Sequence, residues 1–227
     1  VTANFETDIN AGGKAVDLYN DSGTLTVDIA GDLTSEDSSE ELSDHETAGI
    51  FANHEGSGKT TINVGKGISV SSTEVSDEDQ GLDYTAYGID IANIGGTMEV
   101  EVKGDLQASG ADTTGIYVSQ VVDEYAFEAE DTETDDADSD SEDTSPVTTI
   151  TIHGNVAALG SKSGTGVETD TDNGQNTVMI YGNLTGSDYG LVVNAVNDGP
   201  DSFTDILVAE TISGKKASFL VNDEAKF

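Results

Sequence analysis

A two-part phrase recurs along nearly the whole chain and constrains its fold more than any other feature. The first half reads apolar-x-apolar-x-Gly-Asp/Asn-apolar, and full copies begin at Val27, Val100, Ile150 and Val178. The second half begins Gly-apolar, and copies stand at Gly49, Gly88, Gly115, Gly166 and Gly190. From Gly88 to Gly104, and again from Gly166 to Gly182, the interval is 16 residues. A repeat that keeps its spacing predicts units that stack on one another.

The repeated segments have the pattern of short strands. Apolar residues alternate with polar ones over three to five positions that are rich in Val, Ile and Thr, and no helical stripe is sustained. The sequence therefore predicts an all-β fold: a right-handed parallel β-helix, or solenoid, of about six rungs after a leading half-unit at Val16–Asn20. Two imperfect copies carry Lys66 and Glu210 in place of the glycine, so the bend at these two points is open to question.

The charge is strongly acidic and unevenly spread. The chain has 45 acidic residues, 8 lysines and no arginine, for a net charge of −37. This net negative charge repels nucleic acid and anionic membranes, so we expect neither as a partner. The segments Glu36–Glu46, Glu74–Asp83 and Asp123–Asp143 hold 23 of the acids, so we predict acidic loop insertions between strands.

The chain reads as one domain over residues 1–227, with an acidic inserted loop at 121–146. It has no cysteine for disulfides and no apolar run long enough for a membrane helix. Because no export signal stands at Val1, we expect a fragment of a longer surface protein, and we expect it to be a monomer. Tyr125 and Phe127 in the inserted loop either pack on the coil or contact a partner.

Outward-facing positions supply the candidate binding residues. In the second half of the phrase, the residue between the two inward positions should face out, which selects Phe51, Tyr117 and Val192 among others. In the first half, outward positions become apolar toward the C-terminus, at Met179 and Tyr181. We predict a partner surface at these residues; the alternative is that the C-terminal tail or a following domain covers Val192, Leu207 and Leu220.

Catalytic and metal chemistry receives little support from the sequence. His45, His54 and His153 lack the short spacing of a zinc site, and no cofactor is expected. The best calcium candidate is Asp170, Asp172 and Asn173, which lacks the remaining ligands of a calcium loop. Most acids lie in insertions that could not hold two carboxylates at a fixed separation, so we predict no enzymatic activity.

Phrases such as Val100–Gly110 with Thr114–Val118, and Ile150–Val156 with Thr165–Val167, resemble the β-strand repeats of large bacterial surface proteins. These include autotransporter-like passenger regions and adhesins of gut anaerobes. The resemblance implies an extracellular protein of the bacterial cell surface that binds a host protein, either a glycoprotein or, as in some members, an immunoglobulin. Two alternatives remain: a structural spacer within a surface stalk, and a polysaccharide-active β-helix enzyme.

Overall fold

The computed structural model describes residues 1–37, 47–73, 85–120, 145–171, 174–195 and 203–223. These residues form strands joined by short turns and bends, and none of them lies in a helix. The all-β prediction is therefore confirmed. The acidic loop at 121–146 lies outside the described residues apart from Ser145 and Pro146.

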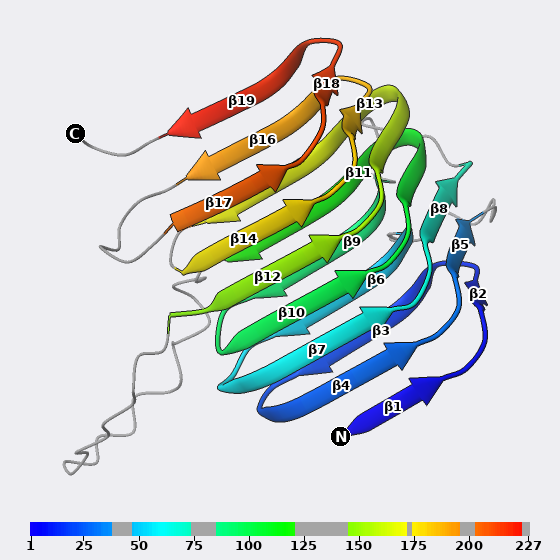
Figure 1. Cartoon of the computed structure of the whole chain (residues 1–227), viewed down its shortest axis with the longest axis vertical. Helices are drawn as coiled ribbons and strands as arrows, with labels where there is room; N and C mark the ends of the chain where they lie inside the picture. The colour runs from blue at the N-terminus through cyan, green and yellow to red at the C-terminus, as the bar shows by residue number, and fades with distance from the viewer. Residues whose placement is uncertain (38–46, 74–84, 121–144, 172–173, 196–202, 224–227) are drawn as a thin grey trace, which may run out of the picture.

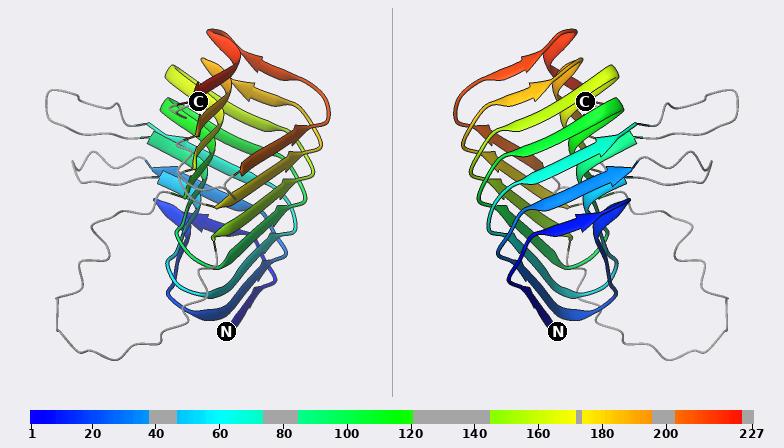
Figure 2. Two further views of the ribbon diagram at one scale, coloured as in Figure 1. Left: turned by 90° about the vertical axis from the view of Figure 1, so that its left-hand side faces the viewer. Right: turned by 90° about the vertical axis from the view of Figure 1, so that its right-hand side faces the viewer.

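One parallel sheet contains seven strands, each contributed by the next repeat along the chain (Figure 1). In spatial order they are β1 (Thr2–Phe5), β4 (Gly23–Ile29), β7 (Gly58–Val64), β10 (Thr97–Val102), β12 (Val147–Ile152), β14 (Gln175–Ile180) and β17 (Phe203–Val208). The N-terminal strands lie at one end of the stack and the C-terminal strands at the other (Figure 2).

The second sheet contains twelve parallel strands in two connected columns. One column consists of β2 (Ile9–Ala11), β5 (Leu33–Asp37), β8 (Ile68–Ser72), β15 (Leu184–Gly186) and β18 (Ile212–Gly214), and the other of β3 (Lys14–Asn20), β6 (Thr47–His54), β9 (Thr85–Asn93), β16 (Tyr189–Ala195) and β19 (Ala217–Asp223). The long strands β11 (Leu106–Gln120) and β13 (Val156–Thr171) run through both columns and join them.

The repeat places equivalent residues in register, so the core is a set of columns. In the seven-stranded sheet, Val27 pairs with Ile62, Ile62 with Val100, and Val100 with Ile150. All four side chains are at most 3% exposed. Full burial of one such side chain contributes about 1.5–3 kcal/mol, so the alternation of the phrase accounts for the stacking.

The repeated glycine of the second half-phrase is required by close approach. A Cβ on Gly115 would lie 2.4 Å from the carbonyl oxygen of Gly166 and 2.8 Å from a methyl carbon of Val156. Gly166 has the same relation to Gly190 in the next repeat, at 2.4 Å. A larger residue would therefore push adjacent turns of the chain apart.

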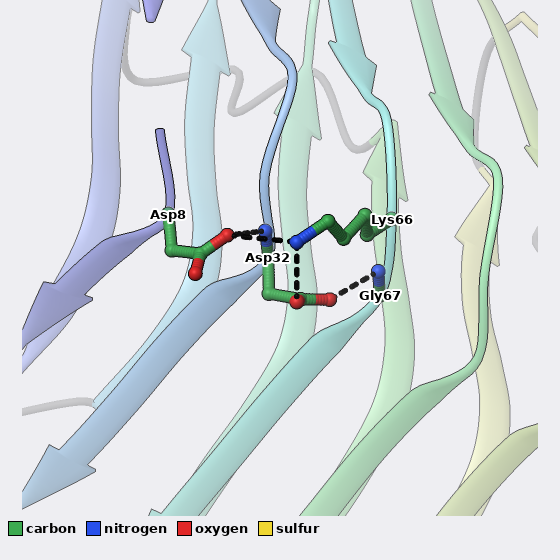
Figure 3. Close-up of polar contacts among 4 residues, drawn as sticks. All are labelled: Asp8, Asp32, Lys66 and Gly67. Atoms are coloured by element: carbon green, nitrogen blue, oxygen red, sulfur yellow. Dashed lines mark hydrogen bonds and ion pairs between the residues drawn. The ribbon is translucent and has the colours of Figure 1, made fainter. Parts of the chain in front are cut away.

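The Asp/Asn of the first half-phrase links one turn to the next. Asp8 Oδ1 accepts a hydrogen bond from the backbone N–H of Asp32 at 2.9 Å, and Asp32 Oδ1 accepts one from Gly67 at 2.9 Å (Figure 3). The same link joins Asp105 to Asn155 at 2.7 Å. These bonds satisfy backbone donors at the bends, where no strand partner is available.

Lys66 keeps the bend although it replaces the glycine of the phrase. Its Nζ lies 3.2 Å from Asp8 Oδ1 and 3.3 Å from Asp32 Oδ2, so it bridges the two preceding turns (Figure 3). The backbone hydrogen bond from Asp32 and then Lys66 lower the pKa of Asp8. Gly67 takes the place of the aspartate, so it offers no side-chain acceptor to the following turn.

A polar seam lines one inner corner, at positions to which the sequence analysis assigned no role. Asn20 Nδ2 donates to Thr60 Oγ1 at 2.8 Å, and Asn93 Nδ2 and Gln120 Nε2 donate to Thr148 Oγ1 at 2.9 and 3.0 Å. Asn20 pairs with His54, His54 with Asn93, and Gln120 with Thr171, and strands β9 and β11 are in register up to Ala92 and Ser119. One polar column results, which consists of Asn20, His54, Asn93, Gln120 and Thr171. All of them are less than a tenth exposed, so their hydrogen bonds are needed to offset desolvation.

The fold begins earlier than the repeat indicates. The sequence places the leading half-unit at Val16–Asn20, but β1 pairs with β4 and β2 pairs with β5. Phe5 and Ile9 keep the apolar alternation, whereas Thr7 stands where the phrase has glycine. The missing glycine hid this first turn, although Asp8 makes the usual link to the next one.

Candidate functional site

The outer face of the seven-stranded sheet becomes apolar at its C-terminal end. Thr151 pairs with Met179, and Met179 with Leu207, in one outward column. Leu207 is 52% exposed, Phe203 48% and Tyr181 49%, and Met179 is partly exposed. We call these four residues the β14–β17 patch: Met179, Tyr181, Phe203 and Leu207. Adjacent strands β14 and β17 hold three of them, and Tyr181 directly follows β14 (Figure 1).

The patch is bordered by a stacked pair of rings. Tyr181 and His153 lie 5.3 Å apart between ring centroids with an interplanar angle of 12°. His153 Nε2 lies 2.8 Å from Glu101 Oε1, and Lys103 also contacts that carboxylate. Lys103 and then His153 lower the pKa of Glu101. The stack holds one face of Tyr181 and leaves half of its surface accessible to a partner.

A second outward column crosses the twelve-stranded sheet as the sequence predicts. Phe51 pairs with Asp90, Asp90 with Tyr117, and Tyr117 with Glu168. Val192 follows Glu168 in the same register. The structure thus brings Phe51, Tyr117 and Val192 into one column, on a different sheet from Met179 and Tyr181.

This second column is more covered than the β14–β17 patch. Val192 is only 6% exposed, and Asp90 is 9% exposed. Lys14 Nζ lies 3.3 Å from the ring centroid of Phe51, a cation–π contact that occupies one ring face. Of the predicted contact residues in this column, Val192 therefore offers almost no surface to a partner.

Tyr117 belongs to a hydrogen-bonded cluster. Its hydroxyl donates to Asp170 Oδ2 at 2.5 Å, and Asn194 Nδ2 donates to Asp170 Oδ1 at 2.6 Å. Burial, and then the bond to Asp170, raise the pKa of Tyr117. Burial, and then the charge of Asp170, raise the pKa of the neighbouring Glu168. The arrangement holds Tyr117 in place and favours the neutral form of the Glu168 carboxyl group.

Several predicted residues lie outside the described part of the chain. Tyr125 and Phe127 fall there, and so do Asp172 and Asn173 of the calcium candidate. Asp170, the remaining member, binds Tyr117 and Asn194 instead. Among the described residues, no cluster of three or more His, Asp or Glu side chains could hold a metal ion.

Sequence reasoning missed Phe203 as a member of the patch. Leu207 was recognised as outward, and Phe203 lies four residues before it, on the same side of a strand. The signal was therefore present in the alternation of β17, which pairs with β14 from Phe203 to Val208.

Comparisons with protein-family models, curated proteins and solved structures found no match to this chain. The described part of the chain contains no helix long and apolar enough to cross a membrane.

Proposed function

We propose that the chain is a non-catalytic protein of the bacterial cell surface that binds a host protein through the β14–β17 patch. The observation that carries the proposal is the exposure of Tyr181, Phe203 and Leu207, each about half accessible on adjacent parts of one sheet face. Exposed apolar side chains that gather on one sheet face often mark a surface that a partner covers.

The stack beneath the patch suits this role. We propose that it is a right-handed parallel β-helix of about six rungs, since connections between parallel strands are right-handed in nearly all proteins. Inward columns fix the backbone, so the outward side chains are held in place before a partner arrives. Preorganisation of this kind reduces the entropy lost on binding.

The identity of the partner is proposed from the resemblance to bacterial adhesins, which favours a host glycoprotein or an immunoglobulin. The net charge of −37 argues against nucleic acid and anionic lipid.

A polysaccharide-active enzyme is the second candidate, and the Glu168–Asp170 pair is what favours it. A raised pKa on one carboxyl beside a second carboxylate is the pattern of an acid and its partner in glycoside hydrolysis. Asp170, however, already accepts bonds from Tyr117 and Asn194. Release of new reducing ends from plant or mucin glycans, abolished in Glu168→Gln, would replace the binding proposal with this one.

The test is a pull-down from serum and mucosal secretion, with bound proteins identified by mass spectrometry. The intact chain is compared with a Tyr181→Ala/Leu207→Ser variant and with a Tyr19→Ala control. Tyr19 is 61% exposed but lies on β3, at the N-terminal end of the stack. We expect one saturable protein that the control retains and the patch variant loses. A blank result with the intact chain would instead favour a spacer within a surface stalk.

A further inference from the structure

The β14–β17 patch contains one carboxylate at its centre. Strand β17 places Phe203, Asp205 and Leu207 on its outer side, and all three are exposed. Alternate residues of a strand are about 6.6–6.8 Å apart, so Asp205 is flanked by an apolar side chain on each side. Its neighbour in register on β14 is Thr177, which is uncharged.

Asp205 differs from the other carboxylates that lie within the strands of this sheet. Asn63 donates to Asp28 at 2.7 Å, Lys59 pairs with Glu99 at 2.7 Å, and Lys103 and His153 contact Glu101. Within the described residues, Asp205 has no hydrogen bond or ion pair from any side chain. Its charge is therefore available to a group that arrives from outside.

We propose that the partner surface carries a basic side chain, arginine in preference to lysine, set between two apolar groups. This inference rests on the proposed function and names the chemistry of its partner. The cation would pair with Asp205, while the apolar groups cover Phe203 and Leu207. A planar guanidinium can bind a carboxylate with two parallel bonds and can also lie over an aromatic ring such as Phe203.

The surroundings of the patch support selection for a cation. Lys103 and His153 at its border are already engaged with Glu101, so they give an acidic partner little to bind. The large negative charge of the chain repels acidic proteins and accelerates encounter with basic ones. Asp205 then determines where a basic partner docks, because it is the carboxylate surrounded by the apolar contacts.

The test uses three synthetic peptides displayed densely on a biosensor surface, so that weak contacts add together. The first carries Leu-Ser-Arg-Ser-Leu, the second replaces its arginine with glutamate, and the third replaces both leucines with serine. The intact chain is compared with Asp205→Asn, Asp205→Lys and the control Asp17→Asn, which removes an exposed aspartate from an outward strand position on the other sheet. Thermal unfolding of each variant establishes that it is folded.

We expect the intact chain to bind the arginine peptide more tightly than the other two. Asp205→Asn should weaken that binding roughly three- to fivefold, the upper part of the range for a solvent-accessible ion pair, while Asp17→Asn stays within about twofold of the intact chain. Asp205→Lys should prefer the glutamate peptide. Equal binding of the arginine and glutamate peptides, or equal losses in Asp205→Asn and Asp17→Asn, would overturn this inference. The binding function itself would survive if the pull-down partner is retained by Asp205→Asn and lost from Tyr181→Ala/Leu207→Ser.

Discussion

Replacement of Gly115 by alanine should destabilise the fold, because the next turn of the chain lies against the position of the new methyl group. The added carbon would lie 2.4 Å from the carbonyl oxygen of Gly166 and 2.8 Å from Val156 Cγ1. The first of these is a backbone atom of the adjacent strand β13, so relief requires movement of a whole turn. Overpacking of this kind costs about 1–3 kcal/mol, and a clash with backbone belongs at the upper end.

An opposing contribution comes from the unfolded chain, which alanine restricts by about 0.4–1 kcal/mol relative to glycine. The net loss of unfolding free energy should therefore be about 2 kcal/mol, or a midpoint about 4–8 °C lower for a chain of this size. Gly12→Ala is the matched control. Its nearest neighbour would be the carbonyl oxygen of Glu36 at 3.7 Å, an ordinary contact.

Urea unfolding and thermal melts followed by circular dichroism measure both variants against the intact chain. We expect Gly12→Ala to lie within about 0.5 kcal/mol of the intact chain or to be slightly more stable. If Gly115→Ala were as stable as Gly12→Ala, the close stacking of β11 on β13 would not be the reason for the repeated glycine, and the reasoning would fail.

Three further predictions concern polar groups that are buried or partly buried. Thr148→Val removes the hydrogen-bond acceptor shared by Asn93 and Gln120 and should cost about 2 kcal/mol of unfolding free energy in a urea titration. Thr149 faces outward, so Thr149→Val should change the unfolding free energy little in the same titration. Burial lowers the pKa of His54, so the stability that the neutral imidazole contributes is present above pH 6.5 and is lost as the pH falls. The difference in unfolding free energy between the intact chain and His54→Gln should therefore shrink from pH 7 to pH 5. Burial raises the pKa of Glu168, so ionisation of this carboxyl group opposes folding at neutral pH. Glu168→Gln should therefore be more stable than the intact chain at pH 7 and equally stable at pH 3.5. A stability advantage that persists at pH 3.5 would refute this assignment.

The stacking of the fold could be predicted from the sequence because the same physical demand recurs in every turn. Alternation set the inward columns, so Val27, Ile62 and Val100 occupy the register that the phrase implies. The first turn was missed because Thr7 replaces the glycine, yet Asp8 still links it to Asp32. The spacing of apolar residues thus carried more information about the stacked strands than the glycine did.

The polar seam was missed because inward positions were assumed to be apolar. A signal was nevertheless present, since Asn20, His54, Asn93 and Gln120 each stand four residues after the first inward residue of their phrase. Which hydroxyl each side chain binds depends on the opposite sheet, and nothing in the local pattern states that Thr60 or Thr148 lies across the corner.

The candidate surface could be predicted in part. The outward direction of Met179, Tyr181 and Leu207 followed from alternation, and their exposure agrees with it. Val192 was predicted by the same rule, but it is 6% exposed. Exposure depends on neighbouring columns and connections, which a strand's own alternation does not describe.

Hydroxyl-radical footprinting of the chain, with and without the protein isolated in the pull-down, shows whether the β14–β17 patch is the binding surface. Met179, Tyr181 and Phe203 carry side chains that such radicals oxidise readily, and Tyr19 and Phe5, which are 61% and 46% exposed, serve as internal references on the opposite end of the stack. We predict that the partner lowers oxidation at Met179, Tyr181 and Phe203 and leaves Tyr19 and Phe5 unchanged. Protection of Tyr19 and Phe5 with full oxidation of the β14–β17 patch would contradict the central claim.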